Sequence, residues 1–262
     1  MGAYTWNPDD KSTSIALSSQ NRVATALTTS GEYAVRATDK RGAGKWYFDV
    51  LIGSGCSSGS AFQIGLMRAT ASIQGGVGNS GGGVSYDLRG YTYLSGAYGY
   101  MGITATAGNV IGVAWDSVAG KIWFSKNNNW MSGNPASGTS PQYNSAELQA
   151  ELYPAVSFYG PHVSANISSM TGNFNSTTFA YSPPAGFEPY GLVQIPIGGN
   201  VTKLGGGAGD AVVIIDATTK GTVAVAIPDE NGDWASTITD DYYVLYLGND
   251  CQPIAHGPYI IA

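Results

Sequence analysis

The sequence predicts an all-β protein built of two domains, and three features of its 262 residues favour this fold class. Glycine is very abundant, with 37 residues, and tyrosine (17) outnumbers phenylalanine (7). Only 11% of the residues are charged, against roughly 25% in an average soluble protein. Helical periodicity is nearly absent, whereas short apolar runs separated by turn-forming residues recur along the chain. Such a chain is expected to form strands joined by tight turns.

The first 190 residues contain a series of strand-like runs separated by Gly- and Ser-rich stretches such as GSGCSSGS and QGGVGNSGGG, which are typical of loops. A single short helical turn is expected at residues 145–150, SAELQA. The strands are expected at residues 33–37, 45–52, 61–67, 83–88, 109–116, 121–125, 153–159, 162–167 and 178–182.

The stretch GKIWFSKNNNW, residues 120–130, could be an aromatic binding surface or the inside of a sandwich. A hairpin with a four-residue turn at 117–120 would place Asp116 opposite Lys121 and Ala114 opposite Trp123. Trp123 would then lie flat on the sheet face opposite the core, under a covering loop. The residues that would share the core face are Val113, Trp115, Ile122 and Phe124. We also expect Trp46, Tyr47 and Phe48 to pack sheets.

Prolines and glycines cluster in SPPAGFEPYGLVQIP, residues 182–196, and a new series of strands follows. We therefore place a domain boundary near Tyr190, which gives domains at residues 1–190 and 191–262. The acidic stretch DENGD, 229–233, does not have the spacing of a calcium loop and is expected to be a hairpin turn on Asn231-Gly232. The strands of the second domain are expected at residues 211–217, 222–228, 234–238, 242–248 and 258–262.

Ordered motifs in the first domain match a known family. GKWYFDVLIG (44–53) has a Gly-x-x-Tyr-aromatic-acidic-Val pattern, and GNVIGVAWD (108–116) has a Gly-x-x-Ile-Gly-x-x-x-Asp pattern. They are followed by GKIWFSKN (120–127), YPAV (153–156), VSAN (163–166) and FAYSPPAGF (179–187). Over most of residues 10–190 the chain resembles the SPRY (B30.2-like) family, although Asn128 stands where that family usually has glycine. The resemblance implies a bent antiparallel β-sandwich without enzymatic activity that binds partner proteins or other ligands through loops at one end.

The second domain is similar to small carboxypeptidase-regulatory-like and Ig-like β-sandwiches, in the residues AVVIIDATTKGTVAVAIPDENGDW (211–234) and YYVLYL (242–247). Its tail CQPIAHGPY (251–259) looks like those of short modules in bacteriophage tail proteins. A SPRY-like domain joined to such a module indicates a phage virion protein of the tail tip, baseplate or tail fibre. The start MGAYTWNPDDKSTS lacks the basic and apolar regions of a signal peptide, so we expect synthesis in the host cytoplasm and a location in the virion.

Two segments contain the residue types that often form recognition surfaces, in which Tyr and Trp supply rigid contact area and Asn, Ser and Gly supply hydrogen bonds. The first is Gly- and Ser-rich, without clear strand alternation, and the second is a long loop. Each could be a binding surface or an internally packed loop. The candidate binding residues are Tyr91, Tyr93, Tyr98, Tyr100, Asn128, Asn129, Trp130 and Asn134.

No catalytic residue, metal site or cofactor is predicted, because the two histidines, His162 and His256, belong to no metal-ligand or nucleophile motif. The net charge of −6 without a basic run argues against a nucleic-acid partner, and no apolar run is long enough for membrane insertion. Cys56 and Cys251 are expected to be free thiols.

The expected partners are other virion tail proteins and a host-surface glycan or protein, and we expect a homo-oligomer. Two other functions stay open. One is an intracellular SPRY adaptor that binds a short peptide of a partner protein, and the other is a polysaccharide-degrading tail component.

Overall fold

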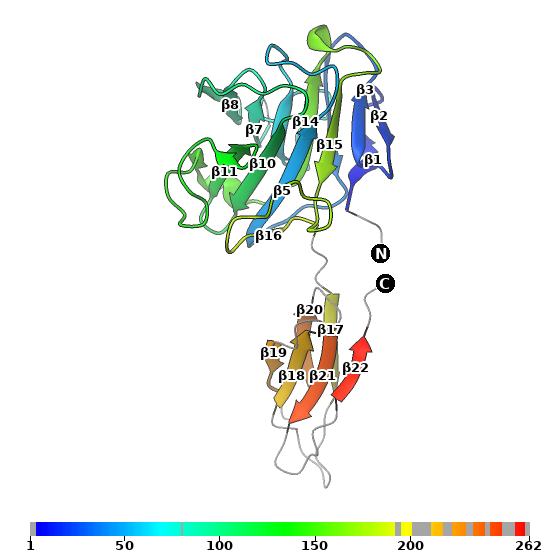
Figure 1. Cartoon of the computed structure of the whole chain (residues 1–262), viewed down its shortest axis with the longest axis vertical. Coiled ribbons are helices and arrows are strands. Elements are labelled where there is room, and N and C mark those ends of the chain that lie inside the picture. The colour runs from blue at the N-terminus through cyan, green and yellow to red at the C-terminus, as the bar shows by residue number, and fades with distance from the viewer. Residues whose placement is uncertain are drawn as a thin grey trace. The chain divides into compact units, whose positions relative to one another are not determined.

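The computed structural model describes residues 4–79 and 81–191 and, after them, the segments 195–200, 211–216, 222–228, 233–238, 242–247 and 255–259. The chain divides into two compact units, Gly2–Gly191 and Leu192–Ala262. Both units are built of strands (Figure 1), which confirms the predicted all-β fold class.

The first unit contains two sheets that share one core. One sheet has seven antiparallel strands in the order β1-β4-β14-β6-β7-β8-β9, and we call it the first sheet. Their bounds are β1 Trp6–Lys11, β4 Glu32–Ala37, β14 Tyr153–Tyr159, β6 Gln63–Met67, β7 Gly83–Asp87, β8 Tyr91–Leu94 and β9 Ala97–Tyr100. The order shows that segments far apart in sequence, such as β4, β14 and β6, lie side by side.

The second sheet has nine strands, seven of which follow the order β12-β11-β10-β5-β15-β3-β2. β13 pairs with β11, and β16 is the one strand of this sheet that runs parallel to its neighbour, β5. The bounds are β12 Asn129–Trp130, β11 Lys121–Lys126, β10 Val110–Asp116, β5 Lys45–Ile52, β15 Ser169–Asn173, β3 Val23–Ala26, β2 Ile15–Ser18, β13 Tyr143–Asn144 and β16 Glu188–Pro189.

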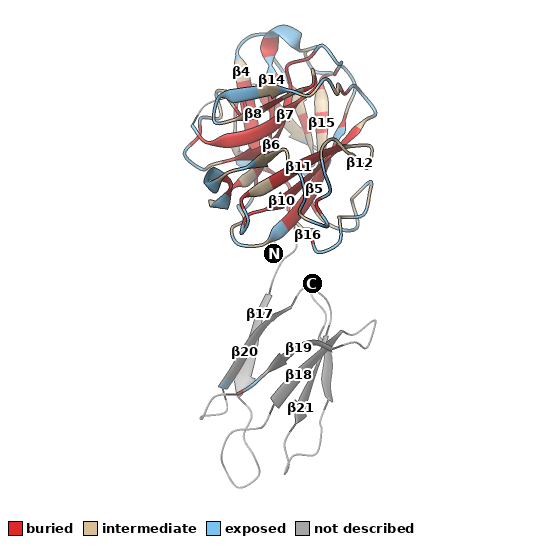
Figure 2. Ribbon diagram, turned by 90° about the vertical axis from the view of Figure 1, so that its left-hand side faces the viewer, coloured by how far each residue is buried: buried red, intermediate tan, exposed pale blue. Residues whose placement is uncertain are grey.

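Central strands of the second sheet are buried on both faces (Figure 2). On β5, Trp46 and Phe48 lie in the core between the sheets, whereas Tyr47 belongs to a second apolar cluster on the opposite face. The segment from residue 178 to 189 covers this opposite face: the Tyr47 ring packs edge-on against Phe179 at 5.0 Å, Phe187 belongs to the same cluster, and β16 pairs with β5. This cover explains why a strand with strict side-chain alternation is apolar on both sides.

The predicted hairpin around residues 113–124 is confirmed in its full register. Asp116 pairs with Lys121 and Ala114 pairs with Trp123. Trp123 is fully buried on the outer face of the sheet, and its indole Nε1 donates a hydrogen bond to the Thr139 carbonyl at 3.0 Å. The core members are, as predicted, Val113, Trp115, Ile122 and Phe124.

Two predicted strands are wrong. Residues 162–167 form the end of the 3-10 helix η2, Gly160–His162, and a turn in which the Ser164 carbonyl accepts two backbone N–H groups. Asn166 has φ 60°, which an extended strand does not allow, and β15 begins only at residue 169. Residues 178–182 belong to the covering segment, where the backbone N–H of Ala180 donates to the Asp49 carboxylate (3.0 Å) rather than to a strand.

The predicted helical turn at residues 145–150 is confirmed as the 3-10 helix η1, Ala146–Gln149. The Ser145 hydroxyl accepts a hydrogen bond from the backbone N–H of Glu147 (3.2 Å), as an N-terminal cap does. Cys56 is buried and has a free thiol, as predicted.

In the segments that the structure describes, the second unit has two antiparallel sheets. β17 Ile195–Asn200 pairs with β20 Asp233–Ile238, and the other sheet has the order β19-β18-β21-β22, with bounds Thr222–Ala226, Ala211–Asp216, Tyr242–Leu247 and Ala255–Tyr259. The four strands predicted at 211–217, 222–228, 234–238 and 242–248 are confirmed, whereas the strand predicted at 258–262 begins three residues earlier, at Ala255. Cys251 and residues 229–232 lie outside the described residues.

Candidate functional site

Four tyrosines share one face of the hairpin β8–β9 at the edge of the first sheet. Tyr91 pairs with Tyr100 and Tyr93 pairs with Tyr98, so that all four side chains lie on the same side; we call them the tyrosine face. The side chains of Tyr98 and Tyr100 are 72% and 66% exposed. The prediction that this segment lacks strand alternation is therefore wrong, because the tyrosines alternate along β8 and β9 with residues on the opposite face.

The hairpin holds the tyrosine face in a fixed arrangement. Its turn is Ser95-Gly96, with φ of 49° and 92°, the left-handed backbone that a two-residue hairpin turn requires. On the inward face Thr92 is fully buried, and its hydroxyl oxygen is 3.0 Å from the Tyr143 hydroxyl and 3.2 Å from the Gln142 side-chain amide. The tyrosine rings also contact one another, with centroids of 4.8 to 6.1 Å apart.

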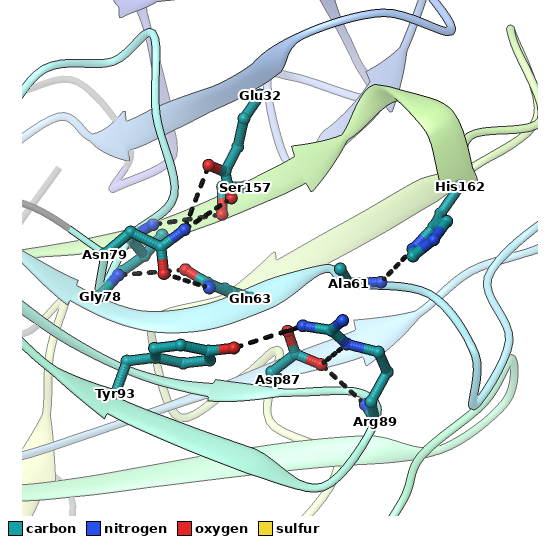
Figure 3. A network of polar contacts seen from close by, with 11 residues as sticks. Glu32, Ala61, Gln63, Gly78, Asn79, Asp87, Arg89, Tyr93, Ser157 and His162 are labelled. Atoms are coloured by element: carbon teal, nitrogen blue, oxygen red, sulfur yellow. Dashed lines mark hydrogen bonds and ion pairs between the residues drawn. The ribbon is translucent and has the colours of Figure 1, made fainter. Parts of the chain in front are cut away.

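An open pocket of about 390 Å³ adjoins the tyrosine face (Figure 3). It lies on the outer face of the first sheet, beside the region where Ala71 and Val77, from the loop between β6 and β7, pack onto that face. The residues that line the pocket are Glu32, Ala61, Gln63, Asn79, Arg89, Tyr93, Tyr159 and His162.

One wall of the pocket is a connected polar network. The Asn79 side-chain nitrogen donates to both carboxylate oxygens of Glu32 (3.0 and 3.1 Å), and Gln63 Nε2 donates to Asn79 Oδ1 (2.9 Å). The backbone N–H of Gly78 donates to Gln63 Oε1 (3.1 Å). Burial raises the pKa of the Glu32 carboxyl, while the hydrogen bond from Asn79 acts in the opposite direction. The network fixes these side chains without a ligand.

Arg89 forms the floor next to the tyrosine face. Asp87 is fully buried and accepts two hydrogen bonds from the guanidinium, from Nε to Oδ1 (2.9 Å) and from Nη2 to Oδ2 (2.8 Å). Nη2 also donates to the Tyr93 hydroxyl (3.3 Å), and the guanidinium carbon lies 5.3 Å from the centre of the Tyr91 ring. Nη1 has no hydrogen bond to any residue that the structure describes, so it is available to a ligand.

His162 lies at the rim, at the end of η2. The backbone N–H of Ala61 donates to its Nδ1 (2.9 Å), so the neutral ring carries its proton on Nε2. The ring also packs edge-on against Tyr159, with centroids 5.0 Å apart. Nε2 is therefore a second donor without a partner among the described residues.

Comparison with known protein families and solved structures identifies the larger part of the first unit. Residues 45–171 match the SPRY domain family model. This part of the chain is a SPRY domain. The structure is similar to that of the SPRY domain of human HERC1, with a TM-score of 0.51 and 18% identity over 64% of this chain and 96% of that one. A second human SPRY domain gives a TM-score of 0.47 and 20% identity, over 62% of this chain and 96% of that one. At this identity the similarity to the HERC1 domain shows the fold alone. A search of curated proteins gave no match.

Among the described residues, no hydrogen bond or ring contact joins the second predicted segment, which contains Asn128, Asn129, Trp130 and Asn134, to the tyrosine face. Asn127 and Asn128, with φ of 49° and 65°, form the two-residue turn between β11 and β12. Asn127 Oδ1 accepts the backbone N–H of Val110 (2.8 Å), and Asn134 Oδ1 accepts that of Ala136 (2.9 Å). These contacts give Asn127 and Asn134 roles in the local fold.

Trp130 and Asn129 line a smaller open hollow of the SPRY domain, of about 240 Å³. Trp130 is half-buried and packs against the cluster that contains Trp123. Asn128 and Asn129 are exposed. Whether these residues bind a partner stays a prediction.

The pocket residues other than Tyr93 are absent from the sequence-based candidates. They come from three strands (β4, β6 and β14), three loops and the 3-10 helix η2, which are distant in sequence, and alternation within one strand gives no indication of them. One local indication of the pocket is that Tyr91 and Tyr93 alternate in β8, which begins two residues after Arg89.

SPRY domains are typically protein-interaction modules.

In the part of the chain that the structure describes, no group of three or more His, Cys, Asp or Glu side chains is arranged to hold a metal ion. Among the same residues no helix is long and apolar enough to cross a membrane.

Proposed function

We propose that this chain is a non-catalytic virion protein of a tailed phage, in the tail tip, baseplate or tail fibre, whose SPRY domain recognises a ligand through the tyrosine face and the adjoining pocket. The observation that carries the binding role is a hairpin that holds four tyrosines on one face, beside a pocket whose polar side chains are already tied to one another. Two of these tyrosines, Tyr98 and Tyr100, are largely exposed. If the face points outward in the virion, the ligand is a host-surface glycan or protein. If it points inward, the ligand is a neighbouring tail protein.

The energetic reason is preorganisation. A tyrosine has few rotatable bonds, so it loses little conformational entropy when it is covered by a partner. Tyr98 and Tyr100 are mostly exposed, so a partner can bury nearly their whole rings. Aromatic residues of this kind commonly contribute about 2 kcal/mol or more each when they are central to an interface.

The phage context rests on the sequence. Few charges and many Gly, Ser and Tyr residues leave a neutral surface, which suits a protein that is covered by neighbours in an assembly. The C-terminal stretch CQPIAHGPY is similar to that of phage tail modules. In this proposal the second unit docks the chain, as a homo-oligomer, onto other tail proteins.

Two experiments test the proposal. Mass spectrometry of purified virions of the encoding phage should detect this chain in stoichiometric amount, and its absence would favour the intracellular SPRY adaptor. The labelled full-length chain should bind host cells, and the double variant Tyr98→Ser/Tyr100→Ser should bind at least about tenfold more weakly.

A matched control for the second experiment is Val118→Ala. Val118 is 65% exposed in the turn between β10 and β11, and its loss should leave binding unchanged. Equal binding by the double variant and the wild type would remove the tyrosine face from the proposal. Release of oligosaccharides from host polysaccharide during the assay would favour the polysaccharide-degrading alternative.

A further inference from the structure

We propose that the pocket beside the tyrosine face binds an uncharged sugar ring of a glycan. This inference rests on the proposed function and names the class of ligand. The polar side chains that line the pocket, their charges and two tyrosines support this ligand class. Figure 3 shows the polar groups in their places.

The first observation is that hydrogen-bond donors and acceptors both face the pocket. The Glu32 carboxylate accepts, and two donors, Arg89 Nη1 and His162 Nε2, are unused by the described residues. A hydroxyl group donates and accepts at the same time, so adjacent hydroxyls of one ring can satisfy both kinds of group. Leaving any of these groups covered and unpaired would weaken binding.

The second observation is the charge balance. Asp87 and Arg89 neutralise one another at 2.8 Å, which leaves the Glu32 carboxylate as the uncompensated charge of the pocket. A carboxylate, phosphate or sulfate on the ligand would meet this negative charge. An ammonium group would pair with Glu32 but would leave the two donors opposite it without an acceptor. A neutral ligand avoids both conflicts.

The third observation is the pair of aromatic walls. Tyr93 and Tyr159 line the pocket from β8 and β14. The face of an aromatic ring is electronegative and attracts the C–H groups that cover one side of a sugar ring. A peptide amide could also donate and accept, but it offers no such C–H face to two tyrosines. The walls therefore favour a sugar over an Asn or Gln side chain.

The volume and the rigidity of the pocket agree with this ligand. At about 390 Å³ it is at the lower end of small-molecule sites, which are usually about 300–1,000 Å³. Because Asn79, Gln63 and Gly78 already hold the Glu32 wall in place, binding requires little rearrangement. One sugar ring in an open pocket should bind with a roughly millimolar dissociation constant, and a homo-oligomer would gain affinity for a repeating glycan through multivalency.

Ligand-detected NMR on the full-length chain tests the inference with methyl glycosides of neutral hexoses, 6-deoxyhexoses and N-acetylhexosamines. Methyl glucuronoside and methyl glucosaminide serve as the anionic and cationic probes of similar shape. At least one neutral glycoside should bind, and both charged probes should bind at least about tenfold more weakly than it does.

The variants Glu32→Gln and Tyr159→Ala should each weaken binding of the neutral glycoside by about tenfold. Glu32→Gln keeps an oxygen for Asn79 and so preserves the wall, and circular dichroism checks that both variants fold. Val118→Ala should bind like the wild type. No binding of any neutral glycoside, tighter binding of a charged probe, or binding that neither pocket variant alters would overturn the inference.

The two proposals fail in different ways. If host cells bind the chain through Tyr98 and Tyr100 but no neutral glycoside enters the pocket, the sugar inference is wrong and the recognition role stands. If a neutral glycoside binds in the pocket but host cells do not bind the chain, the sugar inference stands and host recognition is wrong.

Discussion

Replacing Trp123 with alanine should lower the free energy of unfolding of the first unit by about 3–5 kcal/mol. The indole is fully buried in the cluster of Tyr47, Ala114 and Phe187, on the face of the second sheet that lies away from the main core. Alanine would leave a cavity under the covering segment. β10 is paired with a strand on each side, so its backbone is not free to move in and fill the cavity.

The conservative variant Trp123→Phe separates packing from hydrogen bonding. Phenylalanine keeps much of the apolar contact but lacks the N–H that donates to the Thr139 carbonyl. That carbonyl still accepts the backbone N–H of Asn134 (3.1 Å), and Thr139 is exposed, so the oxygen is not left without a partner. The expected loss is therefore only about 1–2 kcal/mol.

Urea unfolding followed by tryptophan fluorescence measures both losses. Five of the six tryptophans lie within residues 2–191, so the signal reports mainly on the first unit even when Trp123 is replaced. Trp130→Ala is the matched control, because Trp130 is half-buried at the margin of the same cluster and should cost less than Trp123→Ala. A loss below about 1 kcal/mol for Trp123→Ala would refute the assignment of a second buried cluster.

Three further predictions concern the first unit. Asn128→Val should destabilise it by about 1–2 kcal/mol, because φ is 65° there, whereas Asn128→Gly should not; equal melting temperatures for the two would contradict this. Burial raises the pKa of the Asp49 carboxyl above its ordinary 3.8, so the folded state holds this proton to higher pH than the unfolded state does. The free energy of unfolding should therefore fall as pH rises from 3.8 through the raised pKa, and Asp49→Asn should lack this component of the pH profile; parallel profiles would count against it. Burial raises the pKa of the Cys56 thiol to about 11, so peptide mapping should find it unalkylated by iodoacetamide at neutral pH unless the chain is first denatured.

The β10–β11 hairpin shows what the sequence alone can predict. Side chains alternate with a period of two, and a short turn fixes which residues face one another. Once Asp116 is placed opposite Lys121, every other pair follows, and the structure has those pairs. Local pattern and turn length were sufficient because both strands are adjacent in sequence.

The covering segment shows where local pattern fails. FAYSP at 179–183 has the alternation of a strand, but its backbone is held by the buried Asp49 carboxylate and by the turn at Asn175. The hydrogen bond from Ala180 to Asp49 links positions about 130 residues apart. No local stretch of sequence contains both partners. Tertiary contacts therefore override strand propensity in this segment.

The candidate site was predictable only in part. Aromatic and polar composition indicated Tyr91, Tyr93, Tyr98 and Tyr100, but their shared face depends on the Ser95-Gly96 turn and the resulting register. The pocket depends on sheet order, because β4, β14, β6 and β7 become neighbours only in the folded sheet. Sequence alone does not give that order for strands with long connections.

The central claim, that the tyrosine face and the pocket together form one ligand-binding surface, is tested most directly by the dissociation rate of the full-length chain from immobilised host envelopes. Tyr98→Ser/Tyr100→Ser and Tyr159→Ala should each dissociate at least about tenfold faster than the wild type, since most interface substitutions act on the dissociation rate. Val118→Ala should dissociate at the wild-type rate. Indistinguishable rates for all four proteins would contradict the claim.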